Sequence, residues 1–158
     1  MTSQATANDA DMILKLYDLR REAEMRKARN WWLVTFWPER AEDVYKVGMA
    51  MGTAENNWLR QVAGYWEMAA SLVNHGTLNE ALFLEPAFSG EMFFIFAKVR
   101  PFLQELREKF ESPTMWQNIE QVIQRSEKGR TTLKQFEERV AARRKAMAQE
   151  KGKKEAVA

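Results

Sequence analysis

The side chains best suited to acid–base or metal chemistry are scarce in this chain of 158 residues, which has a single histidine, His75, and no cysteine. One imidazole cannot supply the paired Glu-x-x-His ligands of a di-iron helical bundle, and without cysteine there is no thiolate nucleophile or zinc ligand. His75 directly precedes Gly76 at a predicted helix end, where histidine side chains commonly interact with the terminal carbonyls. We therefore interpret His75 as a structural residue and expect no metal or cofactor.

Nucleophile and phosphate-binding motifs are also missing. The chain has no Gly-x-Ser-x-Gly segment, and residues 48–53, which hold two glycines and a threonine, lack the lysine and the spacing of a phosphate-binding loop. The carboxylates of Glu42 and Asp43, and those of Glu137 and Glu138, are adjacent in the sequence. On a helix such neighbours point about 100° apart and do not form a shared acid–base pair. These observations predict that the protein is not an enzyme.

An aromatic cluster is the most unusual feature of the sequence. Three of the six tryptophans, Trp31, Trp32 and Trp37, fall within seven residues, beside Arg26 and Arg29. Tryptophan and arginine are enriched at the energetic centres of protein interfaces. The segment is therefore a candidate interaction surface.

The competing interpretation places the same aromatic rings in the core, between the first and third helices, against Trp58, Tyr65 and Trp66. We favour the core for the cluster as a whole. Because adjacent side chains diverge on a helix, Trp31 and Trp32 cannot both point inward. We expect one of them to be exposed or to be covered by a neighbouring segment.

The C-terminal part of the chain is basic. Residues 125–158 hold 11 basic and 5 acidic side chains, although the whole chain, with 24 and 22, has a net charge of only +2. Arg139, Arg143 and Arg144 therefore form a second part of the candidate surface, which would attract nucleic acid or an anionic membrane. Arg143 and Arg144 fan around the helix, however, and no nucleic-acid-binding motif is present. A solubilising tail would have the same composition.

Apolar side chains recur at steps of three and four residues, which predicts helices, and no strand pattern competes. The clearest stripe runs from Met92 to Phe110 across Pro101, where we expect one kinked helix. The expected fold is all-α, an irregular bundle of five main helices and one or two short ones. The expected helices cover residues 10–34, 39–49, 54–74, 78–84, 90–111, 113–127 and 133–149.

The length of the chain predicts a single domain over residues 9–149, with Asp9 as the cap of its first helix. We expect residues 1–8 to be disordered and residues 150–158 to form a frayed basic tail. No apolar run approaches the ~18 residues of a membrane span, and no secretory signal is visible. We therefore expect a cytoplasmic protein without a transmembrane segment.

Two stretches resemble a known group of proteins. Residues 9–22 (DADMILKLYDLRRE) and residues 58–78, which begin WLRQVAGYWEMAA and end VNHGTL, are similar to small uncharacterised bacterial helical proteins of acidobacterial type. Those proteins belong to a domain-of-unknown-function family. The resemblance covers about residues 9–110, ends near Arg100-Pro101 and leaves out the basic C-terminal helix. It implies a helical fold and a bacterial cytoplasmic setting, and it transfers no functional residue.

Together these patterns favour a non-enzymatic helical interaction or scaffold module that binds an unknown protein partner or a second copy of itself. The aromatic surplus and the missing catalytic parts support this expectation. The alternative is a peripheral binder of anionic membrane or nucleic acid, which would use the basic C-terminal helix and the Trp31/Trp32 region.

Overall fold

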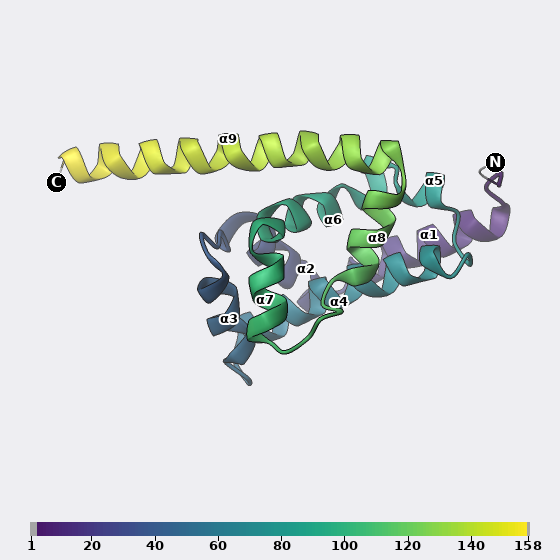
Figure 1. Cartoon of the computed structure of the whole chain (residues 1–158), viewed down its shortest axis with the longest axis horizontal. Helices are drawn as coiled ribbons and strands as arrows, with labels where there is room; N and C mark the ends of the chain where they lie inside the picture. The colour runs from purple at the N-terminus through teal and green to yellow at the C-terminus, as the bar shows by residue number, and fades with distance from the viewer. Residues whose placement is uncertain (1–2, 158) are drawn as a thin grey trace.

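A central helix, α4, organises the molecule and packs against α2, α3 and α8. The computed structural model describes residues 3–157, and these residues form helices and turns without a strand (Figure 1). The all-α fold expected from the sequence is therefore confirmed. The helices are α1 (Ala7–Leu19), α2 (Ala23–Asn30), α3 (Ala41–Met49), α4 (Ala54–Asn74), α5 (Glu80–Phe83), α6 (Pro86–Val99), α7 (Leu103–Lys109), α8 (Gln117–Arg125) and α9 (Glu127–Val157).

The buried core follows the predicted apolar stripes. On α4, Val62, Trp66, Ala69 and Val73 are buried, as their spacing of three and four residues requires. The stripe of α6 and α7 is buried in the same way from Met92 to Leu106, whereas Phe110 at its end is only partly buried. Within the described residues, no helix has both the length and the apolar character needed to cross a bilayer.

The first expected helix, over residues 10–34, is instead two helices. Arg20 ends α1 and turns its side chain into the core, where it is only 5% exposed and donates a hydrogen bond to the Phe88 carbonyl at 3.0 Å. Its guanidinium also lies over the rings of Tyr17 and Trp66. Glu22 then caps α2 by accepting from the backbone of Met25. The charge pattern of the sequence predicted neither the break between the two helices nor the burial of Arg20.

The start of α1 also differs from the expectation. Thr6, not Asp9, is the N-cap, and Asp9 closes a capping box by accepting from the Thr6 backbone. The same carboxylate accepts from the Asn79 backbone at 2.8 Å, beside α5. Hydrogen bonds from Thr6 and Asn79 hold the pKa of Asp9 below its usual value. The helix begins at Ala7, inside the segment that we expected to be disordered, and residues 1–2 lie outside the described residues.

A π-turn over Trp31–Thr35 follows α2 and explains how two adjacent tryptophans share the core. The Phe36 amide donates to the Trp31 carbonyl at 2.8 Å, five residues back. A π-turn holds more residues than an α-turn, so successive side chains diverge less. Trp31 stacks on Phe36 and lies near Trp58, while Trp32 lies against Phe36 and Trp116.

Pro101 separates two helices, so the expected single kinked helix is wrong. A 3-10 turn over Arg100–Phe102 joins α6 to α7, which runs in a clearly different direction (Figure 1). Pro101 has no backbone N–H, so the α-helical ladder is interrupted at this position. The apolar stripe still reaches the core on both sides, through Met92 on α6 and Leu106 on α7.

The chain between α7 and α8 also departs from the expected helix over residues 113–127. Residues 113–116 form a turn, and Trp116 takes a left-handed conformation with φ of 57° just before α8. The Glu67 carboxylate on α4 then caps α8 from outside. It accepts from the Asn118 amide and side chain, each at 2.9 Å, and from the Ile119 amide at 3.1 Å.

Replacing Glu67 with alanine should therefore destabilise the fold by about 2 kcal/mol, because the first amides of α8 lose their acceptors. Gln61→Ala, an exposed change on the same helix, is the matched control and should stay within about 0.5 kcal/mol of the wild type. Urea unfolding of the three proteins measures the difference. Equal stabilities for Glu67→Ala and Gln61→Ala would show that α8 needs no such cap.

The last helix is longer at both ends than the expected helix over residues 133–149. It begins at Glu127, where the Ser126 hydroxyl accepts from the Gly129 amide at 3.0 Å, and it continues to Val157. Residues 150–157, which we expected to fray, belong to this helix, and Ala158 lies outside the described residues. In Figure 1, α9 crosses the top of the molecule and its C-terminal end projects beyond the other helices.

Candidate functional site

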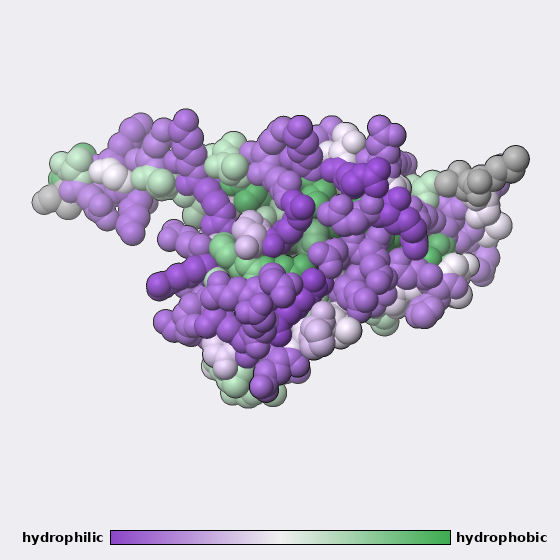
Figure 2. Space-filling model, viewed as in Figure 1, coloured by the Kyte–Doolittle hydropathy of each residue, from purple (hydrophilic) through white to green (hydrophobic). Residues whose placement is uncertain are grey.

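An open groove of about 1140 Å³ lies beneath the projecting half of α9. Its far wall comes from the segment after the π-turn and from the α6–α7 junction, and includes Trp37, Glu39, Pro101 and Phe102. Figure 2 shows apolar surface between α9 and the helices below it, whereas the projecting end of α9 is mostly hydrophilic.

The side of α9 that faces the body changes character along its length. Leu133, Phe136 and Val140 are buried, and α9 packs there on α6 and α8. At the same helical spacing, Arg144 and Met147 follow and line the groove. Further along, Lys151 and Lys154 continue the same side. One face of a single helix thus changes from apolar to basic where it leaves the body.

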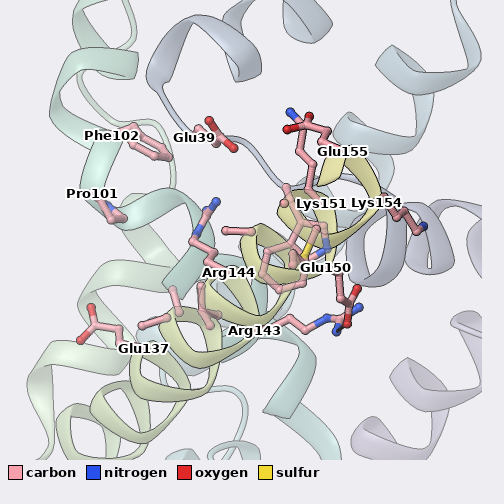
Figure 3. A pocket seen from close by; sticks show the side chains of 17 residues that line it. Glu39, Pro101, Phe102, Glu137, Arg143, Arg144, Glu150, Lys151, Lys154 and Glu155 are labelled. Carbon is pink, nitrogen blue, oxygen red and sulfur yellow. Dashed lines mark ion pairs between the residues drawn. The ribbon is translucent and has the colours of Figure 1, made fainter. Parts of the chain in front are cut away.

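Arg144 joins the two walls of the groove. One terminal nitrogen of its guanidinium donates to the Pro38 carbonyl at 2.7 Å, and its central carbon lies 5.6 Å from the centre of the Trp37 ring. Partial burial lowers the pKa of Arg144 from its usual value. No carboxylate of the described residues lies within ion-pair distance of this guanidinium. Figure 3 shows Arg144 rising from α9 into the groove.

Lys98 lies directly behind the Trp37 wall, with none of its surface exposed. Its amine donates to the Trp32 carbonyl at 2.5 Å and lies 4.0 Å from the centre of the Trp37 ring and 5.2 Å from that of Phe94. Burial, and then the positive charge of Arg144, lower the pKa of Lys98 from 10.5 to about 7. No carboxylate of the described residues forms an ion pair with it.

Sequence reasoning missed Lys98. The signal was present, because Lys98 is the only charged residue between Met92 and Val99, in an otherwise apolar stretch. A lysine at such a position is either exposed at the edge of the stripe or buried with its charge uncompensated. Only the packing of the π-turn segment and α9 over α6 distinguishes these two cases.

The structure removes two tryptophans from the predicted interaction surface. Trp31 is 7% exposed and Trp32 is fully buried, so they belong to the core, as the competing interpretation held. The expectation that Trp31 and Trp32 cannot both point inward is wrong, because the π-turn brings both rings into the core. Trp37 is half-buried and remains at the surface, as part of the groove wall.

The predicted arginines do not form one patch. Arg29 pairs with Glu91 at 2.7 Å, and Arg26 is exposed on the same helix, α2. On α9, Arg139 is exposed with its guanidinium over the Phe136 ring. Only Arg143 and Arg144 line the groove. Of the residues predicted for the interaction surface, Trp37, Arg143 and Arg144 therefore line the groove, and the other five do not.

His75 is exposed at the C-terminal cap of α4. Its backbone amide donates to the Ser71 carbonyl at 2.9 Å. Among residues 3–157, no three histidine, aspartate or glutamate side chains are grouped so that they could hold a metal ion.

These features define an all-α domain with a projecting C-terminal helix. Residues 5–126 match the model of a domain of unknown function, DUF4760, and the chain belongs to this family. The match ends one residue before α9 begins, so the family domain comprises α1 to α8, and the helix that forms the near wall of the groove follows it. Neither a curated protein nor a solved structure matches the chain.

Proposed function

We propose that this protein is a non-enzymatic interaction module that binds a partner protein in the groove beneath α9. We call residues 141–157 of α9 the arm. The observation that carries the proposal is that residues 148–157 are exposed throughout, in a continuous helix, above a wall of aromatic side chains. A helix held away from its own body forms few stabilising contacts, so its exposed surface is available to another molecule.

The composition of the groove supports this proposal. Trp37, Phe102, Met147 and Arg144 line it, and tryptophan, phenylalanine, methionine and arginine are enriched at protein interfaces. A half-buried aromatic wall beside an exposed charged rim resembles the centre and edge of such an interface. We place the module in the bacterial cytoplasm, which fractionation of a natural host would check.

Site-specific photocrosslinking of the full chain, in cells that naturally produce it, tests the proposal. A photoreactive amino acid at position 147 should give an adduct, whereas the same group at exposed position 61 on α4 should not. The protein in the adduct, once purified, should bind the full chain with a Kd below about 10 µM. Adducts of equal yield at both positions, or none at position 147, would contradict the proposal.

The charge of the arm favours a second candidate, a peripheral binder of anionic membrane or nucleic acid. The arm holds six basic and two acidic side chains. Because Trp31 and Trp32 are buried, such binding would rest on the arm alone. It would weaken steeply with salt, and cosedimentation with phosphatidylserine vesicles, or a gel shift with duplex DNA, at two salt concentrations would reveal it.

A further inference from the structure

We infer that the groove accepts an acidic, amphipathic segment of the partner protein, whose apolar side chains contact Trp37 and Phe102 and whose carboxylates face Arg144, Lys151 and Lys154. This inference rests on the proposed function and adds to it the chemistry of the partner.

The charges that line the groove do not balance once the ion pairs within the chain are counted. Glu137 pairs with Arg100 at 2.5 Å, and Glu150 pairs with Arg143 at 3.5 Å. Two carboxylates and three cations that line the groove then remain without an ion pair. The buried amine of Lys98 lies behind the aromatic wall. The carboxylates are Glu39 and Glu155, and the lining cations are Arg144, Lys151 and Lys154. Among the lining groups without an ion pair, the groove therefore carries an excess of one positive charge.

Arg144 has the geometry to receive a carboxylate. Within the described residues, one of its terminal nitrogens donates to the Pro38 carbonyl at 2.7 Å. The same nitrogen lies 3.5 Å from the Lys98 carbonyl, at the limit of a hydrogen bond. Its other two nitrogens have no acceptor there, and neither is among the buried unpartnered atoms, so both reach solvent. Each of these two nitrogens can donate a charge-assisted hydrogen bond to a carboxylate.

A second copy of this chain fits the groove poorly. If two arms paired through the sides that line their grooves, Arg144, Lys151 and Lys154 of one chain would face the same cations of the other. Met147 is the only large apolar side chain of the arm on that side. Like charges without a continuous apolar seam do not stabilise a pair of helices. A partner of opposite charge removes this repulsion and can still cover the aromatic wall.

The test uses the full chain and a fluorescently labelled synthetic helix with leucines on one face and glutamates beside them. Fluorescence anisotropy should show saturable binding, and the same peptide with glutamine in place of every glutamate should bind at least tenfold more weakly. Lys151→Gln combined with Lys154→Gln should weaken binding by about tenfold, since two charge contacts with the glutamates of the peptide are lost.

The matched control combines Lys145→Gln with Lys153→Gln. These two lysines lie on the same arm and carry the same charge, but they do not line the groove. All four lysines are exposed, and none forms an ion pair within the described residues, so neither variant should lose stability. The control should bind the peptide within about threefold of the wild type.

Three results would overturn the inference. One is an equal loss of binding in the two double variants, which would indicate a diffuse basic arm of the kind that binds nucleic acid or anionic lipid. Another is tight binding of the glutamine peptide, and the third is no binding of the glutamate peptide up to about 200 µM. If position 147 still crosslinks to a partner in any of these cases, the proposed function stands and only the acidic chemistry of the partner is wrong.

Discussion

Replacing Lys98 with methionine is expected to stabilise the protein near pH 6 and to destabilise it near pH 10. The buried amine has a folded-state pKa of about 7, against 10.5 for an ordinary lysine. Between these two values the unfolded chain binds more protons than the folded chain, so the stability of the wild type rises with pH across this window. The total rise in the free energy of unfolding is on the order of 5 kcal/mol. The methionine variant does not show this rise, because methionine does not titrate.

The opposite effect at high pH follows from the hydrogen bond that Lys98 donates to the Trp32 carbonyl. A neutral amine keeps this bond, whereas methionine leaves a buried carbonyl without a donor, which costs about 1–3 kcal/mol. Near pH 6 the variant bears the same loss but avoids the larger cost of burying a charge. Its net gain there should be about 2–4 kcal/mol.

Urea unfolding of the wild type and Lys98→Met at pH 6, 7, 8, 9 and 10 measures the predicted crossing. Leu103→Met, a buried apolar substitution on α7, is the control, and its stability should run parallel to that of the wild type at every pH. If Lys98→Met also ran parallel to the wild type, the amine would titrate alike in the folded and unfolded chains. Such a result would contradict the burial of the Lys98 amine.

Gly129→Ala should cost about 3 kcal/mol or more, because this residue lies where the start of α9 meets the end of α8. A Cβ atom at position 129 would lie 2.2 Å from the carbonyl oxygen of Ile123 and 3.0 Å from its carbonyl carbon. Both are backbone atoms, so no flexible side chain can move aside, and the junction of the two helices must shift. Since α9 packs on α6 and α8, the shift would also disturb those contacts.

Gly152→Ala is the matched control, since it makes the same change in the same helix. A Cβ atom there would have no neighbour within 4 Å. Alanine is the better helix former, so the arm should become more helical by circular dichroism and the global stability should change by less than about 1 kcal/mol. Thermal and urea unfolding of both variants tests the pair. A Gly129→Ala protein as stable as Gly152→Ala would disprove the close approach of α8 and α9.

The candidate site was only partly predictable from the sequence. Trp37 and Arg144 are both in the predicted interaction set, because tryptophan and arginine are common at interfaces. Because the two residues are about a hundred positions apart in the sequence, no local pattern predicts that the Arg144 guanidinium lies over the Trp37 ring. Trp31 and Trp32 carry the same composition signal and yet are buried. Residue type therefore indicated candidates, and the contacts made by the rest of the chain decided which of them reach the surface.

The sequence by itself determined the helical class and most of the core, since spacings of three and four residues place apolar side chains on one face of a helix whatever lies beside it. Its local signals missed features that depend on residues distant in the chain. These are the π-turn that buries both Trp31 and Trp32, the cap that Glu67 provides for α8, and the burial of Lys98. Each was decided by tertiary structure, because its free energy comes from contacts between segments that no local pattern brings together.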